Sequence, residues 1–83
     1  MVQVLFFAAF REQLATRRKD LSVEFPATVA SVINQLVAEG GETWHEVLYA
    51  DNVVVALNQE VCERDTVVSD GDELAFYPPV TGG

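Results

Sequence analysis

The chain contains two runs of apolar residues near its ends that are typical of buried strands. Residues 2–9 combine β-branched and aromatic side chains, and residues 73–77 form a second run of this kind. Pro78 and Pro79 end the second run, because proline has no N–H to donate to a β-ladder. These two runs are the most apolar in the chain, so we expect them to lie side by side at the centre of a sheet.

The clearest helix is predicted between these runs. Thr28 is a suitable N-cap and Gly40-Gly41 a suitable end. Between them, apolar residues recur at helical spacing and would form one buried face: Val29, Val32, Ile33, Leu36 and Val37. Shorter helices are predicted over residues 10–15 and 42–49, the latter with Trp44, Val47 and Leu48 facing inward.

The remaining segments predict short strands and turns. A second strand is expected over residues 20–25, with Leu21, Val23 and Phe25 as its apolar positions, and it is a plausible hairpin partner of the first strand. The basic residues Arg17, Arg18 and Lys19 are assigned to the loop before it. A third strand is expected over residues 53–57, followed by a turn and the apolar pair Val61-Cys62. Residues 69–72 predict a tight turn in which Gly71 supplies a positive φ.

This order of elements predicts one α+β domain, in which a sheet packs on one principal helix. With 83 residues, the chain is long enough for one domain and too short for two.

The charge balance bears on the class of partner. Five Lys and Arg face thirteen Asp and Glu, which gives a formal net charge of −8. Surfaces rich in phosphate would repel such a chain, so we expect neither nucleic-acid nor membrane binding. A partner with a basic face would be attracted. Solubility alone, or a salt-rich habitat, explains the acidity equally well.

Cysteine content and hydropathy indicate a cytoplasmic protein. Cys62 is the only cysteine, so no internal disulfide can form, which suits a reducing compartment. No stretch approaches the roughly 20 apolar residues of a membrane span. The first ten residues lack the basic start of a signal peptide.

The side chains of a self-sufficient enzyme are not present in the sequence. His45 is the only histidine and is interpreted as a surface residue. Cys62 has acidic neighbours, which raise the pKa of a thiol and reduce its reactivity, so it is interpreted as structural. The acidic residues in 70–73 fit a turn better than a calcium loop. No bound metal or cofactor is expected.

The last four residues, Val80-Thr81-Gly82-Gly83, suggest a different chemistry. Two terminal glycines can mean simple fraying. Here, however, they follow an apolar strand and two prolines that stiffen the exit of the chain. Five residues from Pro79 reach at most roughly 16–18 Å, and glycine leaves the terminal carbonyl open to close approach. The sequence therefore predicts a carboxylate presented to the active site of another protein.

Such a carboxylate has to be activated before it reacts. Its pKa of about 3.3–3.7 keeps it ionised and a poor electrophile at neutral pH. Adenylation with ATP would activate it, and replacement of AMP by sulfur would leave a thiocarboxylate on Gly83.

At this point the sequence resembles the small, sulfur-carrier subunits of molybdopterin synthase over nearly its whole length. The residues that carry the resemblance are Val4-Leu5-Phe6-Phe7-Ala8 with Arg11-Glu12, Ala56-Leu57-Asn58-Gln59, Asp70-Gly71-Asp72-Glu73, and Phe76-Tyr77-Pro78-Pro79-Val80-Thr81-Gly82-Gly83. The resemblance implies a ubiquitin-like β-grasp fold over residues 1–79, with a mixed sheet of four to five strands packed on one main helix and with its first and last strands as parallel neighbours. It also implies an exposed, flexible tail over residues 80–83.

The resemblance also implies a reaction and its partners. An E1-like adenylyltransferase would use ATP to adenylate Gly83, and a sulfurtransferase would supply sulfur for the thiocarboxylate. The tail would then donate sulfur to cyclic pyranopterin monophosphate in the large synthase subunit, within a heterotetramer of two small and two large subunits. The chain would thus be the sulfur-donor subunit of a sulfurtransferase, without a catalytic site of its own.

The partner-binding residues implied by the resemblance are Phe7, Arg11, Val61 and Tyr77, with Pro78 and Pro79 leading to the tail; for Phe7, a place in the core is the alternative. Three other functions use the same features. The chain could be a protein modifier that forms isopeptide bonds with lysines, a sulfur carrier for thiamine or another metabolite, or a passive binding module.

Overall fold

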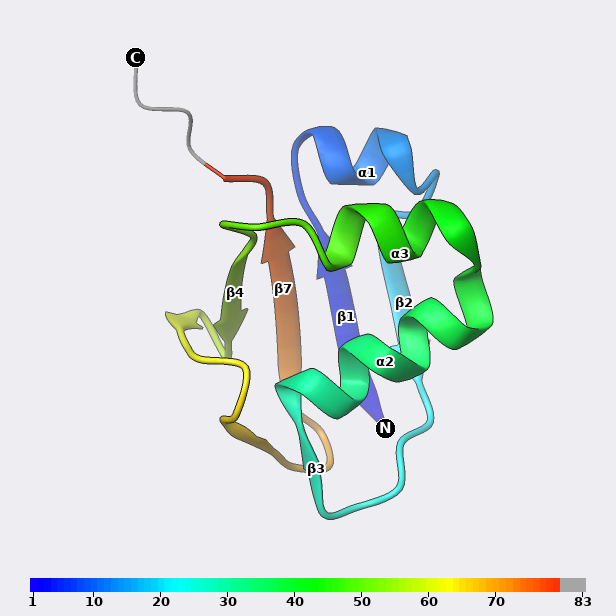
Figure 1. The fold of residues 1–83 in the computed structure, drawn as a ribbon. Helices are drawn as coiled ribbons and strands as arrows, with labels where there is room; N and C mark the ends of the chain where they lie inside the picture. Colours follow the sequence, from blue (N-terminus) through cyan, green and yellow to red (C-terminus); the bar gives the residue numbers. More distant parts are fainter. Residues whose placement is uncertain (80–83) are drawn as a thin grey trace.

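Two parallel strands form the centre of the structure, a computed structural model that describes residues 1–79. Strands β1 (Val2–Phe6) and β7 (Glu73–Tyr77) pair with Val4 opposite Leu74 and Phe6 opposite Phe76. The sheet has five strands in the order β2-β1-β7-β4-β5, and its other neighbours are antiparallel (Figure 1). The predicted central parallel pair is confirmed, as is a mixed α+β sheet. The predicted tail, residues 80–83, lies outside the described residues.

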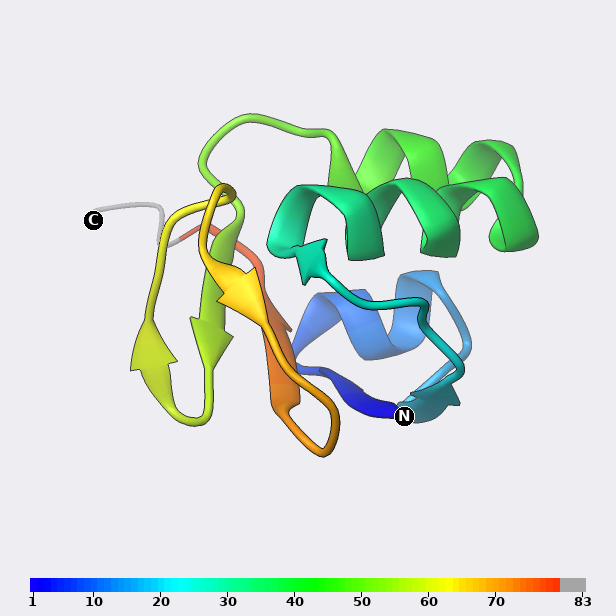
Figure 2. The same cartoon turned by 90° about the horizontal axis from the view of Figure 1, so that it is seen from below.

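The predicted main helix is confirmed as α2 (Val29–Gly40). Thr28 caps it through a reciprocal pair of hydrogen bonds with Ser31, and Gly41 ends it with a φ of 93°. Helix α3 (Glu42–Leu48) follows directly, and both helices cover the same face of the sheet (Figure 2). The short helix α1 (Ala9–Gln13) lies at the end of the sheet where β7 ends (Figure 1). Within residues 1–79 no helix is long and apolar enough to cross a membrane.

The core lies between the helices and one face of the sheet. Side chains alternate along β1, so that Val2, Val4 and Phe6 are buried on the helix side. The ring of Phe6 packs edge-on against Trp44 of α3, with centroids 5.2 Å apart, and stacks with Phe76 of β7 at 5.7 Å. The inward-facing residues predicted for α3 are therefore confirmed. This core holds the central strands, and with them the end of β7, in a fixed orientation.

The second strand is shifted from its predicted position. The predicted strand over residues 20–25 is wrong: β2 spans Arg18–Leu21 and pairs antiparallel with β1. It ends at Leu21, whose partner is Val2, the first residue of β1. Phe25 is 40% exposed as a result. The loop predicted for Arg17, Arg18 and Lys19 is also wrong for the last two, which belong to β2. The connection from β1 contains α1 and is not a tight hairpin.

The other strands are short. Strand β4 (Val54–Leu57) confirms the predicted third strand apart from its first residue, and β5 (Glu60–Val61) extends the sheet by only two residues. Strands β3 (Ala27–Thr28) and β6 (Val67–Val68) form a separate antiparallel pair, which the pattern of the sequence does not predict. This pair holds the start of α2 against the body of the fold.

The predicted turn at residues 69–72 is confirmed and is tied to the turn after β4. Gly71 has a φ of 90°, and the Asp72 carboxylate accepts a hydrogen bond from the Ser69 N–H at 2.8 Å. Asn58, which has a φ of 50°, donates its side-chain amide to Asp72 at 3.1 Å. The side-chain oxygen of Asn58 accepts a hydrogen bond from the Glu73 N–H at 3.0 Å. The carboxylate of Asp72 therefore stabilises this turn and links it to Asn58.

Candidate functional site

The face of the sheet opposite the helices carries a row of apolar side chains. The strand register places Leu5 beside Ala75, Ala75 beside Ala56, and Ala56 beside Val61, so all four point to the same side. Among residues 1–79 no helix covers this side (Figure 2). We call it the open face, and it comprises Leu5, Phe7, Val54, Ala56, Val61, Ala75 and Tyr77.

Two aromatic side chains dominate the open face where β7 ends. The rings of Phe7 and Tyr77 lie 4.7 Å apart and nearly parallel, at 5°. The backbone N–H of Phe7 also donates to the carbonyl of Phe76 at 3.1 Å, which continues the β1–β7 ladder by one residue. Both side chains remain more than one-third exposed, Phe7 at 38% and Tyr77 at 37%. Phe7 is therefore a surface residue, and the alternative that placed it in the core is wrong.

Val61 is the most exposed large apolar side chain in the part of the chain that the structure describes. It lies on β5 at the edge of the open face and is 77% exposed. Monomeric proteins seldom leave a contiguous group of apolar side chains open to water unless it binds something. The structure thus brings together three of the residues predicted to bind a partner: Phe7, Val61 and Tyr77.

The other predicted partner-binding residues lie at the end of the sheet from which the tail departs. Arg11 is exposed on α1, outside the open face, at the same end as the carboxyl end of β7. Pro78 is half-buried and Pro79 is exposed. These two prolines, called the tail root below, follow Tyr77 directly. Gly83 and the tail residues Val80, Thr81 and Gly82 were predicted to carry the chemistry, and they lie outside the described residues.

The groups interpreted as structural behave accordingly. His45 is exposed on α3 and packs edge-on against the Tyr49 ring at 4.7 Å. Cys62 is half-buried, and this burial raises the pKa of its thiol. Glu63 raises that pKa further, while hydrogen bonds with the Thr66 side chain and the Leu57 backbone lower it. A protonated thiol is a weak nucleophile, so Cys62 does not provide a reactive centre.

The sequence alone did not identify four members of the open face: Leu5, Val54, Ala56 and Ala75. Leu5 could have been identified from the sequence, because it and Phe7 are alternate residues of one strand and therefore point to the same side. Val54 could not be assigned to a side until its partner Tyr77 was known. Arg18 was also missed: it lies opposite Leu5 at the rim of this face and pairs with Asp20 at 3.4 Å.

Comparison with known proteins identifies relatives along the whole chain. Residues 4–83 match the model of the ThiS family. The molybdopterin synthase sulfur carrier subunit of Escherichia coli strain K12 is 39% identical over 83 residues, covering 100% of both chains. The protein of the same name from Haemophilus influenzae is 37% identical, again covering 100% of both.

Solved structures show the same fold. The small archaeal modifier protein 1 of Haloferax volcanii superposes with a TM-score of 0.75 at 25% identity, covering 95% of this chain and 97% of that one. A complex of subunits 1 and 2 of the molybdopterin-converting factor from Helicobacter pylori contains a chain with a TM-score of 0.67 at 23% identity. That match covers 99% of this chain and 97% of the other, and it bears on the fold alone.

The family match covers residues 4–83, and both relatives match along their whole length at 37% and 39% identity. This chain belongs to the ThiS family, and within it to the group of molybdopterin synthase sulfur carrier subunits.

Proposed function

We propose that this chain is the sulfur-carrier small subunit of a molybdopterin synthase, working in the cytoplasm and donating sulfur from a thiocarboxylate on Gly83. One observation carries the proposal. The exposed, stacked pair of Phe7 and Tyr77 lies directly before the tail root, so a protein that covers the open face also meets the start of the tail. A surface that docks beside a reactive end is what a carrier without catalytic side chains requires.

The proposed chemistry begins with activation of the Gly83 carboxylate. An oxygen of the carboxylate attacks the α-phosphorus of ATP on an E1-like adenylyltransferase, and pyrophosphate leaves. Hydrosulfide, HS⁻, supplied through a sulfurtransferase, then attacks the acyl carbon, and AMP leaves. The product is a thiocarboxylate, whose soft sulfur atom bonds to a carbon of the pterin precursor, cyclic pyranopterin monophosphate. Hydrolysis of the acyl–sulfur bond then leaves the sulfur on the pterin and restores the Gly83 carboxylate. ATP is a substrate of the partner in this scheme, and the carrier binds no cofactor.

The open face provides the proposed contact with the large subunit. Phe7, Val61 and Tyr77 would become buried there, which stabilises the complex in proportion to the apolar area removed from water. Arg11, Pro78 and Pro79 would contact the same subunit around the tail. The net charge of −8 would speed encounter with a basic partner. A heterotetramer of two carriers and two large subunits is the expected assembly.

Intact-mass analysis tests the reaction at Gly83. The chain is produced with its activating enzyme and a sulfur source, and a gain of about 16 Da, the change from oxygen to sulfur, is expected. A variant lacking Gly83 should show no gain and no sulfur transfer, while its melting temperature stays unchanged because terminal residues contribute little to stability. If wild-type chain remains at its unmodified mass under these conditions, the proposal fails.

A second function, protein modification, is favoured by one structural neighbour. The small archaeal modifier protein 1 of Haloferax volcanii shares the fold at 25% identity, and an activated Gly83 could acylate a lysine amine as readily as it accepts sulfur. Mass spectrometry of cell extracts distinguishes the two. Lysines of other proteins that carry the C-terminal peptide of this chain, which trypsin would leave as residues 65–83 because Arg64 is its last basic residue, would support modification. Carrier found only free, or bound to the large subunit, would support sulfur transfer alone.

A further inference from the structure

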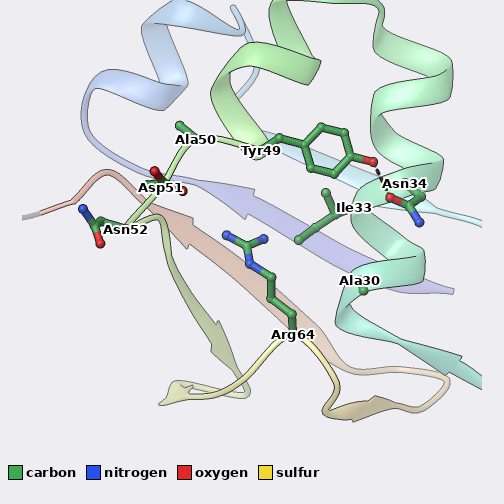
Figure 3. Close-up of a pocket in the computed structure, with 8 residues that line it drawn as sticks. All are labelled: Ala30, Ile33, Asn34, Tyr49, Ala50, Asp51, Asn52 and Arg64. Atoms are coloured by element: carbon green, nitrogen blue, oxygen red, sulfur yellow. Dashed lines mark hydrogen bonds between the residues drawn. The ribbon is translucent and has the colours of Figure 1, made fainter.

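A hollow on the helix side of the sheet lies outside the proposed docking surface. Its volume is about 250 Å³, and it opens between α2 and the loop that joins α3 to β4 (Figure 3). Ile33 forms part of its apolar wall, and the ring of Tyr49 closes one side, with its hydroxyl donating to the side-chain oxygen of Asn34. Asp51 is exposed at the rim.

One positively charged side chain extends into this hollow. Arg64 comes from the connection between β5 and β6, and Figure 3 shows its guanidinium group directed toward the 49–52 loop. The residue is half-buried, and within residues 1–79 it makes neither an ion pair nor a side-chain hydrogen bond. Its backbone is fixed, because the Arg64 carbonyl accepts a hydrogen bond from the Ala30 N–H at 2.8 Å.

The guanidinium group of this half-buried residue, which has no side-chain partner within residues 1–79, is suited to one kind of ligand. Its five donors have a planar fork geometry that matches a carboxylate or phosphate in a bidentate pair. Such pairs are stronger and more directional than neutral hydrogen bonds. The apolar wall formed by Ile33 and the Tyr49 ring suits the aliphatic part of an acidic side chain.

The hollow lies next to the tail root. Strands β4 and β7 are antiparallel with Val54 opposite Tyr77, so the residues before Val54 run beside the residues after Tyr77. Asp51 and Asn52, which line the hollow, belong to that segment. The hollow and the open face therefore flank the tail root on opposite sides of the sheet.

Size and charge favour a side chain of a docked protein over a free small anion. The volume of about 250 Å³ is below the roughly 300–1,000 Å³ that small-molecule sites usually have. The net charge of −8 and the nearby Asp51 also repel a free anion. A side chain held by a docked partner overcomes this repulsion, because docking elsewhere raises its effective concentration to roughly millimolar.

We propose that the hollow around Arg64 receives a carboxylate side chain of the large synthase subunit, which would then hold the carrier on both sides of the tail root. The pairing aligns the carrier as well as binding it, since a bidentate contact fixes orientation while the open face supplies apolar area. This inference rests on the proposed function, because it names the large subunit as the partner.

Affinity measurements with the large subunit provide the first test. Calorimetry with full-length carrier should give a Kd about tenfold or more higher for Arg64→Gln than for wild type, as expected when a charged hydrogen-bonded pair is lost. The matched control is Arg17→Gln, which removes the same charge from an exposed position and should leave the Kd within about twofold. Thermal melts establish that each variant is folded.

Cross-linking provides a second test that does not depend on a loss of affinity. Lys19 is the only lysine in the chain, so Arg64→Lys adds one defined amine inside the hollow. A zero-length carbodiimide reagent should then join position 64 to an acidic residue of the large subunit, which peptide mass spectrometry identifies. Arg17→Lys is the control and should give no cross-link of comparable yield.

The outcomes separate this inference from the proposed function. If wild-type carrier does not bind the large subunit, the proposed function itself fails. If wild type binds and Arg64→Gln binds equally well with no cross-link from position 64, only the second contact is overturned. It is also overturned if Arg64→Gln weakens binding to the activating enzyme but not to the large subunit.

Discussion

Val61 offers a sharp test of the open face, because it is exposed in the free chain and would be buried in the complex. Val61→Ala removes two methyl groups, worth about 0.8 kcal/mol each when they leave water completely. Val61 is 77% exposed, so most of that transfer remains to be gained on docking. The expected loss of binding free energy is about 1.2 kcal/mol, or roughly an eightfold increase in the Kd for the large subunit. Val61→Asp should weaken binding further, because it would bury a carboxylate.

The control for Val61 is Val67, an exposed valine that lies away from the open face. Val67 is 63% exposed and also belongs to a two-residue strand, but that strand pairs with β3 in the separate sheet. Val67→Ala should leave the Kd within about twofold, and both substitutions should change the free energy of unfolding by at most about 0.5 kcal/mol. Isothermal titration calorimetry measures the affinities. Equal Kd values for Val61→Ala and Val67→Ala would refute the assignment of the open face as the docking surface.

Three further predictions concern the rest of the fold. Asn58→Ala removes two side-chain hydrogen bonds that tie two turns together, and it places alanine at a φ of 50°. We expect a loss of about 2 kcal/mol, or a melting temperature lower by about 8–16 °C, and Asn58→Gly should recover part of it by relieving the backbone. The N-terminal ammonium group of Met1 hydrogen-bonds to Asp70 and lowers the pKa of its carboxyl. The resulting stabilisation is fully present above the pKa that Asp70 has in the unfolded chain. It is lost as the pH falls through the lower pKa that Asp70 has in the folded chain. Acetylation of the N-terminus should raise this pKa toward its ordinary value in an NMR titration, and an unchanged pKa would contradict the pairing. Burial raises the pKa of Cys62, and Glu63 adds a smaller increase, so iodoacetamide should alkylate it more slowly at neutral pH than it alkylates a small free thiol. Alkylation as fast as that of the free thiol would contradict this assignment.

The elements that could be predicted from sequence were those whose signal is local. The periodicity of Val29, Val32, Ile33 and Leu36, with Thr28 as N-cap, defined α2 almost residue for residue. The need for a positive φ identified the turn at Gly71 in the same way. The central strands were equally clear, because each is a run rich in β-branched or aromatic residues.

The elements that could not be predicted depend on pairing between distant residues. The strand after the first connection was placed at residues 20–25 because Leu21, Val23 and Phe25 alternate, and alternation alone cannot say how far a partner strand extends. The start of β1 at Val2 limits β2 to its observed range. Arg64 shows the same limit: the sequence analysis did not single it out, and only the packing of the 49–52 loop against α2 places it in a hollow.

Strand register determines which residues lie beside the tail root. The pairing of Val54 with Tyr77, for example, places the residues before Val54 next to the two prolines. Successive side chains on a strand point to opposite faces, so a shift of one residue in β7 would turn Tyr77 away from the open face and Phe76 out of the core. The buried ring of Phe76, which is 0% exposed, excludes that shift energetically. The same packing that stabilises the core therefore keeps Tyr77 beside Phe7 and keeps residues 51–53 beside the tail root. Core packing in this way fixes the relative positions of the open face, the hollow and the two prolines of the tail root, and this is the geometry that a docked partner would meet.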